Sequence, residues 1–199
     1  MKKLLIILAI AFVLIGIPIM MAIGTYNGLV GREQAVDAAW AQVENVYQRR
    51  ADLVPNLVAT VSGAADFEKS TLTEVTNARA SVGKLQLPPG APDDAARFAQ
   101  FEQAQSQLGG ALSRLLVSVE RYPQLTATAN FRDLQAQLEG TENRISVERG
   151  KFNTTVQSYN TAIKKFPAVI LAGLFGHEAK PYFTAAPGSN EAPKVDFGG

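Results

Sequence analysis

The sequence contains no cysteine among its 199 residues and only one histidine, His177. Without cysteine, the chain cannot form a disulfide framework, a thiolate metal site or a thiol nucleophile. The lone histidine lies outside the predicted helices, so the paired Glu-x-x-His motifs of a di-metal centre are missing and core serines and threonines have no obvious base. No convincing strand precedes a glycine-rich phosphate loop. We therefore expect no metal, no cofactor and no enzymatic activity.

The net charge of the chain is close to zero. Nineteen lysines and arginines balance eighteen acidic residues, which leaves a formal charge of +1 at pH 7. This balance provides no general attraction to nucleic acid or to an anionic surface. We expect no nucleic-acid partner.

Charged side chains are absent from residues 4–23, which read LLIILAIAFVLIGIPIMMAI. A helix of this length is about 30 Å long and matches the hydrocarbon core of a bilayer. The apolar centre of a secretory signal peptide is shorter, about 7 to 15 residues, and residues 20–24 form a poor cleavage site. We predict a retained membrane anchor at residues 1–24. A cleaved, secreted chain stays open as an alternative.

The charges that flank the anchor predict its orientation. Lys2 and Lys3 precede it, whereas the first charge after it is Arg32. The positive-inside rule leaves the short N-terminus in the cytoplasm and the remaining chain on the other side of the membrane.

After the anchor, apolar residues recur at alternating spacings of three and four, as on the buried face of a helix. The first such helix is predicted at about 25–65 and is kinked by Pro55 at residues 51–54 rather than ended there. A second is predicted at about 67–85, and residues 87–92 form a loop.

Two further helices follow that loop. Asp93 or Asp94 is expected to cap the third helix, which stops at Pro123. The fourth begins near residues 127–130 and is closed by Pro167.

Short connections make neighbouring helices antiparallel. We therefore predict an all-α fold, in which one transmembrane helix precedes an up-and-down four-helix bundle of two long and two shorter helices at residues 25–183. Residues 184–199 have no core to join and are predicted to be a flexible tail.

Aligning the ends of the two long helices pairs residues whose numbers add up to about 192. This register places Trp40 against Phe152, as ordinary core packing, and Arg50 opposite Glu142. We predict a partly buried Arg50–Glu142 ion pair that fixes the register of the helices rather than a ligand site. Asn56 or Asn143 is expected to bind backbone groups that Pro55 leaves unpaired.

Residues 166–176, FPAVILAGLFG, follow the fourth helix and return to the bilayer end of the bundle. This stretch is too short to span a membrane. It either folds over the open end of the bundle as a lid, which we favour, or lies in the membrane interface as a shallow second anchor. The side chains that would touch lipid are Phe166, Val169, Ile170, Leu171, Leu174 and Phe175.

Several motifs resemble one known family. They are RRADLVPNLV at 49–58, ERYPQL at 120–125, TENRI at 141–145, and the pairs Tyr26-Asn27, Phe152-Asn153, Tyr159-Asn160 and Phe166-Pro167. Together they resemble the LemA family over residues 1–183. The resemblance implies a membrane helix followed by a four-helix bundle in the envelope of bacteria, here the inner (plasma) membrane. It implies no agreed catalytic activity, and one branch of the family is associated with magnetosome membranes.

These observations favour a non-catalytic, membrane-tethered helical module that binds protein partners or further copies of itself, with the lipid bilayer as its other partner. A membrane-shaping or ring- or pore-like oligomeric assembly is the alternative.

Overall fold

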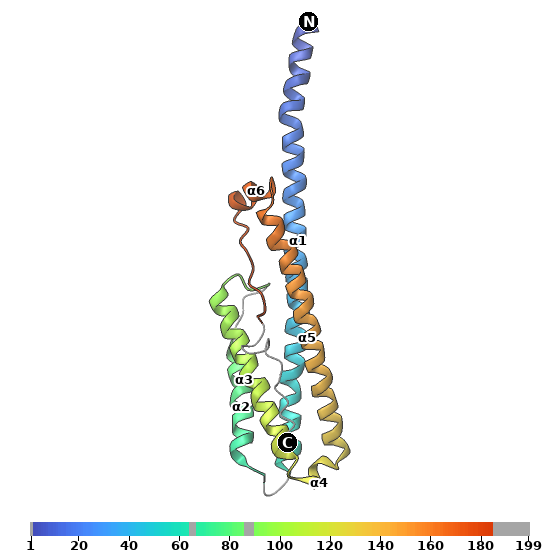
Figure 1. Cartoon of the computed structure of the whole chain (residues 1–199), viewed down its shortest axis with the longest axis vertical. Helices are drawn as coiled ribbons and strands as arrows, with labels where there is room; N and C mark the ends of the chain where they lie inside the picture. Colours follow the sequence, from blue (N-terminus) through green and yellow to red (C-terminus); the bar gives the residue numbers. More distant parts are fainter. Residues whose placement is uncertain (1, 64–66, 86–89, 185–199) are drawn as a thin grey trace, which may run out of the picture.

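The computed structural model describes residues 2–63, 67–85 and 90–184, and every regular element among them is a helix. The elements are α1 (Lys2–Ser62), α2 (Lys69–Lys84), α3 (Ala95–Val119), α4 (Pro123–Thr126), α5 (Ala129–Lys164) and α6 (Ala168–Phe175) (Figure 1). The predicted all-α class is confirmed. Of the predicted tail, 184–199, only Thr184 falls within the described residues.

Helix α1 joins the apolar N-terminal run to the first long helix without interruption. It continues for 61 residues, through Gly24 and through both Pro18 and Pro55. At about 1.5 Å per residue it is about 90 Å long. Within the part of the chain that the structure describes, α1 alone is long and apolar enough to cross a membrane, and its apolar stretch is not covered by other elements.

The two long helices, α1 and α5, lie side by side (Figure 1). They run in opposite directions, because Arg32 near the start of the pair donates to Ser158 Oγ at 2.6 Å while Arg50 contacts Glu142 further along. Helix α2 packs on α3 and on α1. The lower part of α1 is therefore flanked by other helices, whereas Figure 1 shows its N-terminal part extending alone beyond α6.

The buried side chains form two clusters along this axis. The cluster nearer α6 is rich in aromatic rings and centres on Trp40, whose ring centroid lies 5.4 Å from that of Phe152. The other cluster is mostly aliphatic and includes Leu57, Leu108 and Leu115.

The third helix ends earlier than the sequence predicted. Helix α3 stops at Val119, and Pro123 opens the short helix α4 instead of terminating α3. A proline is well tolerated at the first helical position because no helical donor is needed there, and it pushes the preceding Tyr122 into a non-helical conformation.

Candidate functional site

Arg50 interrupts the buried stripe of α1 and is itself buried. Its Nη1 lies 3.0 Å from Glu142 Oε2 on α5. Its Nη2 donates to two oxygens of Gln105 on α3, the backbone carbonyl at 2.9 Å and the side-chain Oε1 at 2.7 Å. The structure thus places the predicted pair in contact and adds Gln105, so that one guanidinium links three helices.

This ion pair is buried on one side only. The Arg50 side chain is 5% exposed, whereas that of Glu142 is 63% exposed. A solvated carboxylate interacts weakly with its partner because water screens the charge. The buried guanidinium therefore depends strongly on Gln105 for hydrogen bonds, and Glu142 contributes less than a partner in a fully buried pair.

A cleft of about 610 Å³ opens beside this group and is lined by residues of α1, α3 and α5. Its charged lining residues face one another. Arg149 Nη2 lies 3.2 Å from Glu102 Oε1, and Arg50 contacts Glu142. Because charges of both signs line the cleft in compensating pairs, it does not select a ligand of either sign, and we assign it none.

Pro55 removes one backbone donor from α1 and so frees the carbonyl of Ala51. Arg79 on α2 donates its Nε–H to this oxygen at 3.1 Å. The expectation that Asn56 or Asn143 would bind the freed carbonyl is wrong, because an arginine from the neighbouring helix reaches it. The proline thereby becomes a docking point for α2.

The chain beyond α6 folds back along α5 and is held there by two asparagines. Asn160 exchanges two hydrogen bonds with the backbone of Lys180, at 2.8 and 2.9 Å, and Asn153 does the same with Phe183, at 2.9 Å each. Seven residues of helix span about 10.5 Å, and three residues of extended chain span about 10 Å. The two spacings match, so a straight helix can fix an extended segment at two points.

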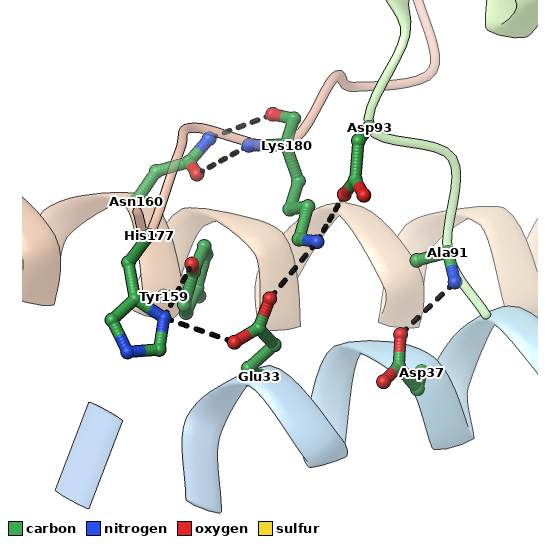
Figure 2. Close-up of polar contacts among 8 residues, drawn as sticks. All are labelled: Glu33, Asp37, Ala91, Asp93, Tyr159, Asn160, His177 and Lys180. Carbon is green, nitrogen blue, oxygen red and sulfur yellow. Dashed lines mark hydrogen bonds and ion pairs between the residues drawn. The ribbon is translucent and has the colours of Figure 1, made fainter. Parts of the chain in front are cut away.

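A polar cluster lies where this returning segment crosses α1 (Figure 2). Glu33 of α1 binds two groups at once: its Oε2 lies 2.9 Å from His177 Nδ1, and its Oε1 lies 3.1 Å from Lys180 Nζ. Lys180 also contacts Asp93, and the Tyr159 hydroxyl lies 3.4 Å from His177 Nδ1. This polar cluster ties α1, α5, the segment after α6 and the loop before α3 together.

The same stretch of α1 holds the loop before α3. Asp37 Oδ1 accepts the backbone N–H of Ala91 at 3.0 Å (Figure 2). Of the two predicted caps, Asp94 is the one used, since its Oδ1 accepts from Ala96 and Arg97 at 2.7 and 3.3 Å. Asp93 is directed to Lys180 instead.

Burial and charge shift two pKa values in this cluster. Burial raises the pKa of Tyr159 to about 12, and the nearby carboxylate of Glu33 adds to the effect. Burial by itself lowers the pKa of Lys180, but the hydrogen bonds and charges of Asp93 and Glu33 outweigh it, so the net shift is upward. Both shifts favour the protonated forms, which are a neutral phenol at Tyr159 and a charged ammonium at Lys180.

The geometry around His177 suits a clamp better than a catalytic relay. His177 lies outside the helices, as the sequence predicted, but its side chain is only 8% exposed and contacts both long helices. In a relay, one ring nitrogen binds the carboxylate and the other binds the nucleophile. Here Glu33 and Tyr159 both approach Nδ1, while Nε2 is buried without a protein partner among the described residues.

Among the residues that the structure describes, no group of three or more histidine, aspartate or glutamate side chains is placed so that it could hold a metal ion.

Several residues of this cluster stand out in the sequence, although the helical periodicity did not predict their partners. Glu33 and Arg50 are the two polar exceptions in the apolar stripe of α1, and the register that pairs Arg50 with Glu142 also places Tyr159 opposite Glu33. Asn153 and Asn160 each follow a buried aromatic residue, seven positions apart. Their backbone partners lie in an irregular segment, which no periodicity reveals.

Comparison with known proteins identifies relatives over most of the chain. A sequence model of the LemA family matches residues 39–197. This match begins after the predicted anchor and includes most of the predicted tail, so it differs at both ends from the range of 1–183 over which the motifs resemble the family.

Curated relatives include two kinds of protein. The magnetosome protein MamQ of Magnetospirillum gryphiswaldense is 27% identical over 180 residues, which cover 81% of this chain and 65% of the relative. Magnetosome protein MamQ 2 of Paramagnetospirillum magneticum is 26% identical over the same shares. Protein LemA of Metamycoplasma hominis is 22% identical over 152 residues, 76% of this chain and 65% of the relative. The aligned part of the chain thus spans about 65% of the length of the curated relatives it matches.

Proposed function

We propose that this chain, which belongs to the LemA family, is a membrane-tethered, non-catalytic helical module of the bacterial envelope. It acts by binding other proteins or further copies of itself. The single observation that carries this proposal is the continuity of α1. One helix supplies both the exposed apolar stretch and the central stripe of the core, so the membrane anchor and the folded part are mechanically one piece.

The proposed topology follows from charge. Lys2 and Lys3 stay in the cytoplasm, residues 1–24 span the inner membrane, and residues 25–183 stand outside as an antiparallel four-helix bundle, with 184–199 as a tail. A rod that stands on one anchor exposes long polar flanks at a fixed distance from the lipid. Such flanks suit a binding surface for protein partners.

A second candidate is a membrane-shaping or ring-like assembly. The magnetosome name of the MamQ relatives and the exposed apolar residues of α6 favour it. A discrete closed ring in detergent, seen by mass measurement or imaging, would support assembly, whereas a monomer would count against it.

The topology is tested with single cysteines, since the chain has none of its own. Val117 on α3 is exposed and is replaced in Val117→Cys. The N-terminal probe is a single cysteine inserted directly after Met1, so that Lys2 and Lys3, the charges that carry the proposed orientation, are both kept. In right-side-out spheroplasts, a membrane-impermeant maleimide should label the cysteine at 117 at once and the N-terminal cysteine only after permeabilisation. The reverse pattern would overturn the orientation, and labelling of both without permeabilisation would overturn the anchor.

Binding to partners is tested in native membranes. Photo-crosslinkers on the exposed faces of α2 and α5 should trap either a defined second protein or a second copy of the chain. Exclusively monomeric chain after crosslinking from both faces would contradict a binding role.

A further inference from the structure

Helix α6 carries its small side chains inward and its large apolar side chains outward. Ala168 and Ala172 are buried against α1 and α5. The large residues around them are exposed: Phe166 81%, Val169 46%, Ile170 61%, Leu174 74% and Phe175 55%, with Leu171 partly covered. Isolated apolar residues are normal on a protein surface, but a contiguous group of this kind indicates a contact surface. A lid would bury these residues, whereas here the alanines form the contact.

The height of α6 along α1 indicates what that surface meets. The ring of Phe175 lies 4.7 Å from the ring of Tyr26, three residues beyond the end of the apolar run at Ile23. Three helical residues advance about 4.5 Å along the axis. The polar headgroup layer on each side of a bilayer is about 5 to 8 Å thick. If the apolar run fills the hydrocarbon, α6 therefore lies in the headgroup layer.

The exposed apolar surface of the anchor reaches the same level. Ile19, Met20, Met21 and Ile23 are all exposed, and only α1 extends beyond α6 in Figure 1. The apolar surface that must enter the bilayer and the apolar surface of α6 thus adjoin along the axis.

Charge around α6 fits a lipid surface as well. Residues 166–176 carry no charge, while Arg32, Lys164 and Lys165 are exposed just below them. Glu178 is the exposed acidic residue nearby in sequence. Cations next to an apolar helix face favour an interfacial position, because the apolar side chains reach the acyl boundary while the cations meet anionic headgroups.

The segment that follows α6 is firmly held. His177 contacts Glu33, Lys180 contacts Glu33 and Asp93, and Asn160 clamps the backbone of Lys180. The polar cluster therefore fixes α6 at one height on α1.

We propose that α6 is a second, shallow attachment of this chain to the same bilayer that holds α1. Its outward side chains enter the boundary between headgroups and acyl chains. This inference depends on the proposed anchoring of α1. Two attachments side by side set the tilt and rotation of the bundle, which a single helix leaves free.

The test uses the full-length protein in vesicles of phosphatidylethanolamine and phosphatidylglycerol. A small fluorophore is attached to one cysteine at a time: Ile170→Cys and Leu174→Cys on α6, Ile10→Cys in the anchor, and Val117→Cys on α3. All four positions are exposed, so none of the substitutions removes a core contact. Each sample is quenched in turn by nitroxide-labelled lipid and by aqueous iodide.

The fluorophores at 170 and 174 should be quenched severalfold more by nitroxide lipid than the fluorophore at 117, and be shielded from iodide. Iodide quenching equal to that at 117 would overturn the proposal. Shielding from both quenchers would also overturn it, since it would show that protein covers α6. Lipid quenching at 10 but not at 170 and 174 would refute the role of α6 alone, whereas failure at 10 would refute the anchor and α6 together.

Discussion

Replacing Arg50 should destabilise the protein more than replacing Glu142, its partner in the ion pair. In a symmetric buried pair, loss of either side costs about 3 to 5 kcal/mol, because the other charge is left buried and unpaired. In this protein the two partners differ, because the Arg50 side chain is buried and the Glu142 side chain is exposed. Arg50→Ala removes a buried side chain that makes three hydrogen bonds and lies 5.1 Å from the ring centroid of Tyr47.

For Arg50→Ala, we expect a loss of about 3 kcal/mol or more, since hydrogen bonds to a charged group contribute about 1.5 to 3 kcal/mol each and the Gln105 acceptor is left unpaired. Glu142→Ala removes a carboxylate that is mostly solvated, and Arg50 keeps both bonds to Gln105. We expect its loss to be about 1 kcal/mol.

Trp40 provides the assay. It is the only tryptophan and is fully buried among aromatic rings, so its fluorescence reports unfolding of the folded part. Urea titrations of the full-length protein in detergent should shift the midpoint much more for Arg50→Ala than for Glu142→Ala. Gln105→Ala should lie between them. The matched control is Glu139→Ala, which removes an exposed acid one turn away from Glu142.

Equal losses for the two partners would refute this reasoning, because they would show that Glu142 is the main counter-charge despite its exposure. A Glu142→Ala loss that persists unchanged in high salt would refute it as well, since a solvated pair is screened.

Three further results are expected. Gly140→Ala should raise the free energy of unfolding by about 1 kcal/mol, because nothing lies within 4 Å of the added methyl group and alanine favours the helix; a decrease by urea titration would contradict the packing of α5. Tyr159 has its pKa raised to about 12, so its neutral form contributes stability that is complete below pH 10 and is lost as pH rises through about 12. Tyr159→Phe should therefore flatten the thermal stability profile between pH 10 and 12, and a profile as steep as that of the unsubstituted chain would contradict this role of Tyr159. Asn160→Ala should accelerate hydrogen exchange in residues 177–184, since both hydrogen bonds between the Asn160 side chain and the backbone of Lys180 are lost. Exchange no faster than in Asn130→Ala, a substitution at an exposed position, would contradict the role of Asn160 as a clamp.

The sequence predicted best where one local rule was sufficient. The apolar run at residues 4–23 and the three-four stripes identified α1 and α5 because side chains on one helix face recur with the helical period. The register between these helices was predicted by aligning their ends. That register pairs Arg50 with Glu142, and these two side chains are in contact in the structure. The end of α3 was missed because Pro123 can stop one helix or start another, and the sequence alone does not distinguish the two.

By itself, then, the sequence determined the all-helical class, the apolar N-terminal segment and the positions of the two polar exceptions, Glu33 and Arg50, since all three depend on residue order along one helix. Only the tertiary structure decided what those residues bind. Arg50 meets Gln105, Arg79 reaches the carbonyl freed by Pro55, and Glu33 meets His177. It also decided that α6 turns alanines inward and large apolar side chains outward. These choices depend on segments far apart in the chain, whose meeting is set by packing and not by any local pattern.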